Sequence, residues 1–302
     1  MRAFKQWRSP RTTGWVPFIL IAPAALLLGV FVYLPLGYTF YLSFLRWNMI
    51  SSVKKWAGLA NYSAVLNAPE FWIALKNTVI YTIILFGIVF ALPYFLAYGM
   101  AFRAPRVGKL LRGLYFLPSV LSLAVASILY LWLLHPLSGP IARFISLLGL
   151  DSPAWFSSFG WVIVAISLIT AWKIFGYHLI VFLAGMTGIP RELIEAARID
   201  NVSPWKIFWH IVRPLTSATA LYVLVLTVVM GTQYVFVPIQ ILTGGGPDKG
   251  STNLIFFTYQ YAFQFFQTGR GAAAAVMVIF IFAAFLVLQK KVLEKGVYYE
   301  HE

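Results

Sequence analysis

The hydrophobic residues of this chain gather in long runs that short polar stretches separate. Six runs are long enough to cross a bilayer, since a membrane-spanning helix needs roughly 20 apolar residues. We expect spans at about residues 15–36, 78–101, 114–134, 161–183, 218–242 and 271–288. A seventh apolar run, 254–266, holds only about a dozen residues, so we predict an interfacial segment or a return helix on the outer face.

Composition agrees with this pattern. The chain has 302 residues, of which 61% are hydrophobic and 11% are charged, whereas a soluble domain has about 25% charged residues. We therefore predict an all-α polytopic membrane protein with six transmembrane helices, forming one domain over residues 1–302. The absence of Cys excludes disulfides and thiolate metal sites.

The net charge of +14 comes from basic residues that are concentrated in the predicted loops. Fifteen of the 23 basic residues fall on the four stretches that six spans would leave on one side, and loops rich in Lys and Arg stay in the cytoplasm. This interpretation puts both termini in the cytoplasm and makes lipid a partner, not nucleic acid. The fifteen are Arg2, Lys5, Arg8, Arg11, Arg103, Arg106, Lys109, Arg112, Arg191, Arg198, Lys206, Arg213, Lys290, Lys291 and Lys295.

The stretch 188–214, GIPRELIEAARIDNVSPWKIFWHIVRP, is the longest polar interruption in the second half of the chain. We predict two short helices: one with Pro190 at its first position, and one that Ser203 caps and Pro214 ends. Leu193, Ala196 and Ala197 fall on one face of the first helix at helical spacing, and small Ala residues on that face would let a partner approach closely. A cytosolic loop lying on the membrane surface is the alternative.

The segment Glu195-Ala196-Ala197, followed by Asp200 and Pro214, resembles the EAA loop of binding-protein-dependent ABC importer permeases. The family usually has Gly after the Asp; here Asn201 stands there, the next most tolerant residue for a left-handed backbone. The resemblance implies that these six residues couple the chain to an ATPase, with Ala197→Trp blocking that contact.

Polar residues inside predicted spans are the usual functional signal in a membrane protein. None of them is Asp or Glu, which disfavours proton- or sodium-coupled carriers. Aromatic and neutral polar groups suit a sugar or polyol, although such residues also join helices. Lys173 could instead pair with a backbone carbonyl or extend to the outer membrane interface. The candidate substrate contacts are Trp172, Lys173, Tyr177, Thr232, Gln233 and Tyr234. By resemblance, Tyr177 and Thr232 match polar contact positions of maltose-type subunits.

The sequence contains no residue pattern typical of an enzyme. The four His residues are scattered and form no metal-binding pair, and we expect His178 to pack in the core. The Gly-rich stretch 244–252 places Lys249 before Gly250, in the wrong order for a phosphate-binding loop, and is predicted to be a turn. We expect a transport subunit that binds no cofactor and is not an enzyme.

The resemblance extends over nearly the whole chain, to the carbohydrate-type, maltose-permease-like first subunit. It implies the type I ABC importer permease fold, a second homologous permease, two ATPase subunits that use ATP and Mg²⁺, and an extracytoplasmic solute-binding protein. It also implies a bacterial or archaeal inner membrane. Glycerol 3-phosphate as substrate is one alternative, and an ATPase-independent carrier or channel is another.

Overall fold

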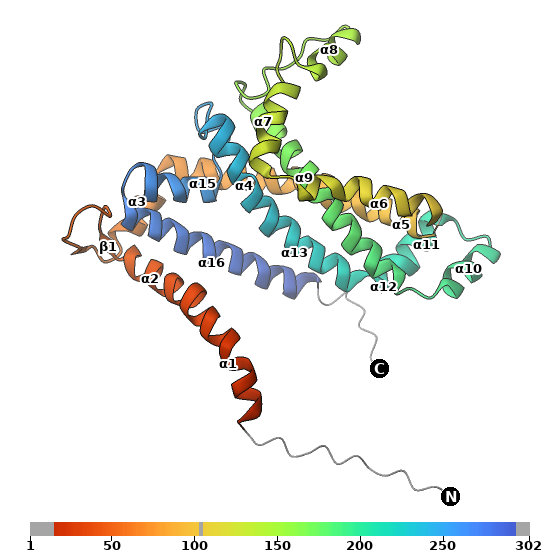
Figure 1. Ribbon diagram of the computed structural model, residues 1–302, viewed down its shortest axis with the longest axis horizontal. Helices are drawn as coiled ribbons and strands as arrows, with labels where there is room; N and C mark the ends of the chain where they lie inside the picture. Colours follow the sequence, from red (N-terminus) through yellow and green to blue (C-terminus); the bar gives the residue numbers. More distant parts are fainter. Residues whose placement is uncertain (1–14, 103–104, 294–302) are drawn as a thin grey trace, which may run out of the picture.

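A computed structural model describes residues 15–102 and 105–293. These residues form an elongated bundle of helices, with a small two-stranded hairpin at one end and the pair α10 (Arg191–Ile199) and α11 (Pro204–Ile207) at the other (Figure 1). Among the described residues, five helical stretches are long and apolar enough to span a membrane: Val16–Ser43, Pro69–Phe102, Trp161–Thr187, Ser217–Thr243 and Thr268–Gln289. A bent helix pair, Leu111–Val120 and Leu123–Leu133, counts as a sixth when it is taken as one broken span.

Several spans contain short π-helical turns, so each is built from more than one element. The first joins α1 (Val16–Leu28), η1 (Gly29–Tyr33) and α2 (Leu34–Ser43), and the second joins α4 (Pro69–Leu85), η2 (Phe86–Ala91) and α5 (Leu92–Phe102). The fifth joins α13 (Ser217–Tyr234), α14 (Phe236–Pro238) and η4 (Ile239–Thr243). The second span begins at Pro69, earlier than the expected residue 78, because the polar first turns of α4 continue the same helix.

The helix α9 (Trp161–Thr187) is the centre of the bundle. It packs against α4, α5, α6 (Pro105–Val120) and α13. Of the residues in its most apolar stretch, 61% are buried. Gly176 makes the α6 contact possible, because a Cβ atom there would lie 1.9 Å from the carbonyl oxygen of Tyr115. By contrast, none of the residues in the most apolar stretch of the first span is buried.

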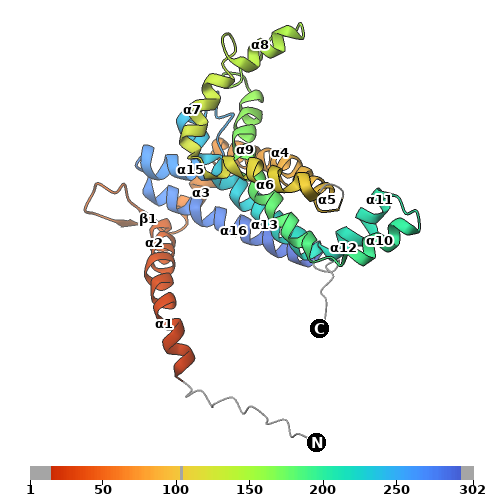
Figure 2. The same cartoon turned by 45° about the vertical axis from the view of Figure 1, so that its right-hand side comes forward.

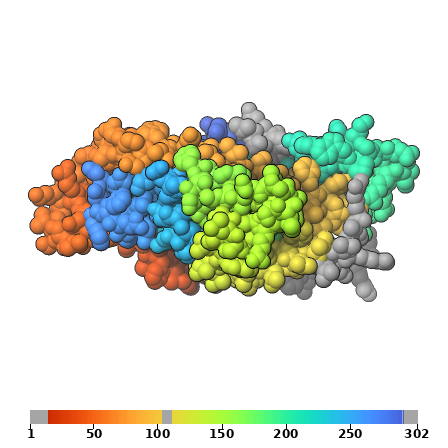
Figure 3. Space-filling model, turned by 90° about the horizontal axis from the view of Figure 1, so that it is seen from above, coloured from red at the N-terminus to blue at the C-terminus, as the bar shows by residue number. Residues whose placement is uncertain are grey.

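The third span differs from the continuous helix expected over 114–134. α6 and α7 (Leu123–Leu133) meet at a bend of 103°. Pro118 lies in the last turn of α6, where it cannot donate a hydrogen bond to the Leu114 carbonyl and so weakens the turn that precedes the bend. Beyond it, α7 and α8 (Pro140–Leu147) leave the bundle (Figure 1) and appear as a yellow-green mass in Figure 3.

The apolar run 254–266 forms α15 (Leu254–Tyr259) and η5 (Gln260–Gln264), which pack on α16 (Thr268–Leu293). It is not among the membrane-spanning candidates. The preceding Gly-rich turn is buried against α4: the Asn77 amide donates to the carbonyls of Lys249, Gly250 and Thr252 at 3.1, 3.1 and 3.0 Å. The predicted turn is therefore a fixed part of the core.

Candidate functional site

The segment between the fourth and fifth spans carries the predicted coupling residues. Its first helix, α10, ends in a Schellman motif: the Val202 amide donates to the Ala197 carbonyl at 2.9 Å, and the Asn201 amide to the Arg198 carbonyl at 3.0 Å. Asn201 has φ 56°, the left-handed conformation that the sequence analysis anticipated for this position. Asp200 is the residue after the last helical turn, with its side chain exposed.

Two predicted helix boundaries in this segment are wrong. Pro190 has an extended backbone, with ψ 128°, and precedes the helix as its cap instead of occupying its first turn. Pro214 does not end the second helix, because α11, η3 (Phe208–Val212) and α12 (Arg213–Leu215) follow without a break, and Thr216 ends the run. The ring of Pro214 is accommodated because η3 has already changed the hydrogen-bonding register there. The predicted Ser203 cap is confirmed: its hydroxyl accepts from the Lys206 amide at 3.4 Å.

Three contacts join α10 and α11 to the end of α5. The Arg198 guanidinium donates to the Phe102 carbonyl at 2.6 Å, and the Tyr98 hydroxyl donates to the Pro204 carbonyl at 2.9 Å. The Trp205 ring stacks on Phe95, with ring centres 5.7 Å apart. The elbow of α10 and α11 projects from the bundle (Figure 2) but is fastened to its second span.

The outer face of α10 is both apolar and acidic. Leu193, Ala196 and Ile199 are exposed at a helical spacing, and the side chain of Ile199 is 80% exposed. Glu195 is exposed beside them. Ala197 lies on the other side, half-buried against the cluster that contains Ile194, so Leu193, Ala196 and Ala197 do not share one exposed face as the sequence analysis expected.

The candidate substrate residues of the fourth span fall into two groups. Lys173 donates through Nζ to the carbonyls of Ser119, in the last turn of α6, and Leu121, in the break before α7. The Ser119 hydroxyl donates back to the Lys173 carbonyl at 3.1 Å. Trp172 packs edge-on to Tyr130, with ring centres 5.7 Å apart. The expected alternative for Lys173, a backbone-carbonyl partner, is what the structure shows.

Tyr177 has a different environment. It is half-buried, and Tyr222 and Tyr234 of α13 lie close to it. Gln233 is exposed nearby on α13, so these side chains form a polar and aromatic strip on α9 and α13. Tyr222 was not predicted, because one Tyr within an apolar run gives no local signal. The Tyr residues supply hydroxyl groups and flat apolar faces together.

Thr232 is buried, with its hydroxyl donating to the Val228 carbonyl at 2.7 Å. Its own carbonyl accepts from the Asn253 amide at 2.9 Å. The predicted core position of His178 is confirmed: its side chain is fully buried, and Nδ1 lies 2.7 Å from the Val89 carbonyl oxygen. Within residues 15–102 and 105–293, no three His, Asp or Glu side chains gather as metal ligands would.

Known proteins that are similar to this chain agree with a membrane-spanning architecture. Residues 93–297 match the family described as "Binding-protein-dependent transport system inner membrane component". The chain is 32% identical over 295 residues to the probable ABC transporter permease protein YurN of Bacillus subtilis, covering 93% of this chain and 97% of that protein. It is 30% identical over 284 residues to the sn-glycerol-3-phosphate transport system permease protein UgpA of Agrobacterium fabrum, covering 94% and 96%.

Among solved structures, the chain is similar to a chain of a bacterial alginate ABC transporter in complex with an alginate pentasaccharide-bound periplasmic protein. The TM-score is 0.78 at 20% identity, covering 92% of this chain and 93% of that one. That likeness shows a shared fold, in agreement with the predicted type I importer permease architecture. The match over residues 93–297 and the relatives over nearly the full length agree, so this chain belongs to the family of binding-protein-dependent transport system inner membrane components.

Proposed function

We propose that this chain is the sugar-translocating permease subunit of an ATP-driven importer, and that α10 is the helix through which a separate ATPase drives it. The observation that carries the proposal is the exposed face of Leu193, Ala196 and Ile199. Such an apolar face on a projecting helix suits a groove on a partner protein. The acidic side chains beside it, such as Glu195, would fix the orientation of docking.

The anchoring of this elbow supports a mechanical role. Arg198, Tyr98 and Trp205 tie α10 and α11 to α5, so a displacement of the elbow would carry the second span with it. When ATP and Mg²⁺ bind to the partner ATPase dimer and close it, two such elbows would move together, one from this chain and one from a second homologous permease. The spans would then rotate to open the substrate path outward.

The roles of the other predicted coupling residues follow from their positions. Asp200 and Asn201 would set the angle between α10 and α11, because the left-handed residue reverses the chain there. Pro214 would pass the movement into α13 through the continuous run of η3 and α12. Ala197 would keep α10 close to its own bundle.

Docking is tested by Ala196→Trp, with Ala154→Trp as the matched control on an exposed Ala in another segment. Ala196 is a better position than Ala197, since Trp at half-buried Ala197 would also disturb the core of this chain. We expect Ala196→Trp to insert into the membrane normally but to lose co-purification with the ATPase, while Ala154→Trp retains it. Undiminished co-purification of the Ala196→Trp variant would refute the docking role.

The substrate class follows from the strip on α9 and α13. Tyr177, Tyr222, Gln233 and Tyr234 offer hydroxyl, amide and aromatic groups, which suit a neutral sugar. A polyol phosphate would need a free cation, and Lys173 is engaged with the carbonyls of the bend. The sugar would arrive from an extracytoplasmic solute-binding protein, the kind of partner present with the alginate transporter.

The competing substrate, glycerol 3-phosphate, is named for the relative in Agrobacterium fabrum. Thermal-shift measurements on the cognate binding protein, with neutral sugars in one series and glycerol 3-phosphate in the other, separate the two. Stabilisation by the phosphate alone would overturn the sugar assignment. Family membership gives no support to an ATPase-independent carrier or channel. We place the chain in a bacterial or archaeal inner membrane with both termini in the cytoplasm and no ATPase site of its own.

A further inference from the structure

A cavity of about 380 Å³ lies beside the two-stranded hairpin. Figure 1 places this hairpin at the opposite end of the bundle from α10 and α11. The hairpin of β1 (Leu45–Arg46) and β2 (Lys55–Trp56) forms one side, and the start of α16 forms the other. Gly269 lets them approach, because a Cβ atom there would lie 1.9 Å from the Leu45 carbonyl oxygen. The Gly269 amide also donates to the Trp47 carbonyl at 3.4 Å. The walls are thus held together by the backbone.

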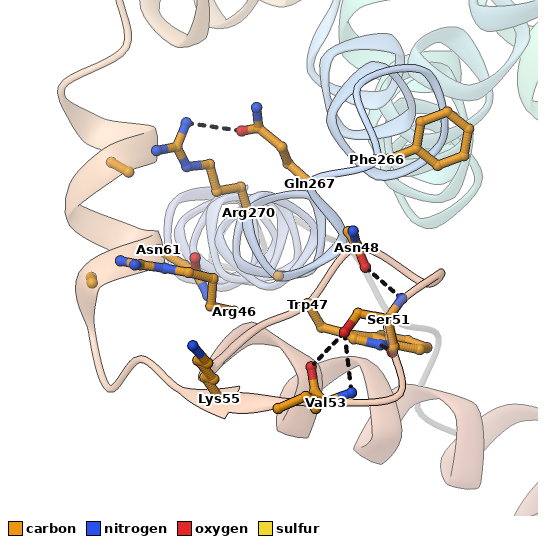
Figure 4. A pocket seen from close by; sticks show the side chains of 13 residues that line it. Arg46, Trp47, Asn48, Ser51, Val53, Lys55, Asn61, Phe266, Gln267 and Arg270 are labelled. Atoms are coloured by element: carbon orange, nitrogen blue, oxygen red, sulfur yellow. Dashed lines mark hydrogen bonds between the residues drawn. The ribbon is translucent and has the colours of Figure 1, made fainter.

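Three basic side chains line this cavity, and no acidic side chain does. Arg46 and Lys55 come from the hairpin and Arg270 from α16 (Figure 4). Glu70 and Arg270 both lie near Tyr261, but Glu70 is not among the residues that line the cavity. The guanidinium of Arg270 donates to the Gln267 side chain at 2.8 Å, which is a neutral acceptor.

The pairing of the hairpin brings two like charges together on exposed side chains. Arg46 and Lys55 are directly opposite each other in the antiparallel register. Side chains in this relation have Cβ atoms about 5 Å apart, and like charges there destabilise the pair. An anion between them would remove the repulsion and leave two attractive contacts.

We propose that this cavity binds an oxyanion group, a phosphate or carboxylate, between Arg46, Lys55 and Arg270. Guanidinium and ammonium groups hold such groups through charge-assisted hydrogen bonds, and the neutral lining residues Asn48, Ser51 and Gln267 add further polar groups. A bound anion would clamp the hairpin, and with it the outer end of the first span, onto the start of α16. The proposal does not rest on the transport role, since it uses only these residues.

The group could belong to a soluble anion or to the headgroup of an acidic lipid, and two arms of one experiment separate these sources. In the first arm, the full chain is placed in phosphatidylcholine nanodiscs and titrated with inorganic pyrophosphate. In the second, phosphatidylglycerol is added to the nanodiscs and no soluble anion is present. The shift in melting temperature is recorded in both arms, because a ligand that binds only the folded state raises it.

The variants are Lys55→Gln and Arg270→Gln, with Arg143→Gln as the matched control on an exposed basic residue of α8 that does not line the cavity. In buffer without anions, Lys55→Gln should melt no lower than the wild type, because it relieves the repulsion with Arg46. In the arm that supplies the ligand bound by the cavity, the melting temperatures of the wild type and of Arg143→Gln should rise. The two cavity variants should bind roughly ten- to a hundredfold more weakly.

A response in the first arm identifies a soluble anion, and a response in the second arm alone identifies a lipid headgroup. Added salt should weaken binding in either case. The proposal is overturned if neither ligand stabilises the wild type, or if Arg143→Gln loses as much affinity as the cavity variants. It is also overturned if Lys55→Gln lowers the melting temperature without anions, which would give Lys55 a structural role. Loss of ATPase docking in Ala196→Trp would not bear on these outcomes.

Discussion

Replacing Lys173 by Met tests whether this cation holds the bend between α6 and α7. The substitution keeps the apolar stem but removes both hydrogen bonds to the carbonyls of Ser119 and Leu121. A hydrogen bond from a charged donor contributes about 1.5–3 kcal/mol in a protein interior, whereas hydrogen bonds between membrane helices average about 0.6 kcal/mol. The Leu121 contact is exposed and falls at the low end, so the sum is about 2 kcal/mol.

That loss corresponds to a fall in melting temperature of about 3 °C for a protein of this size. The bend itself can be measured, because the chain has no Cys and two introduced ones would be unique. Spin labels at Leu117→Cys on α6 and Ile128→Cys on α7, both exposed positions, report the distance across the bend. We expect one narrow distance distribution in the wild type and a broad one in Lys173→Met.

The conservative change Lys173→Arg keeps a cation with several donors and should retain both the melting temperature and the distance distribution. A Lys173→Met variant that melts like the wild type with an unchanged distance distribution would refute the structural role. Loss of transport in such a variant would then point to a direct contact between Lys173 and substrate.

Three further predictions concern single backbone or side-chain contacts. Asn77→Ala leaves three buried carbonyls of the Gly-rich turn without their donor and should cost about 2 kcal/mol; unchanged thermal unfolding and unchanged resistance of the turn to protease would contradict this. Gly176→Ala should force α6 away from α9 at Tyr115 and lower the melting temperature. The control Gly113→Ala, at an exposed position of α6 with nothing within 4 Å, should leave the melting temperature unchanged or raise it slightly. Equal melting temperatures of the two variants would show that the close approach is not needed. Asn201→Val should lose about 1–2 kcal/mol through its left-handed backbone, and Asn201→Gly should lose nothing; the thermal stability of both variants measures this, and an Asn201→Val protein as stable as Asn201→Gly would rule out the backbone explanation.

Local pattern was enough to predict the parts of this protein that depend on residue type and spacing. The membrane spans follow from apolar length, because a bilayer requires about 20 apolar residues whatever they contact. The cap at Ser203 and the left-handed Asn201 follow from the backbone preferences of single residues. The candidate coupling segment was also found from residue type alone, because it is a run of charged residues in an otherwise apolar part of the chain.

Contacts between distant residues were decided only by the tertiary structure. The cation at the bend of the third span comes from Lys173, 52 residues from Leu121, and no local pattern joins the two. The same holds for the division of α10, in which Ala196 is exposed and Ala197 packs inward, because the position of α5 and α9 determines which face is covered. The basic cavity arises in this way too: Arg46 and Arg270 are far apart in sequence and come together only where the hairpin meets α16. Hydrophobic length selects which segments enter the membrane, but packing between them selects which polar groups remain available.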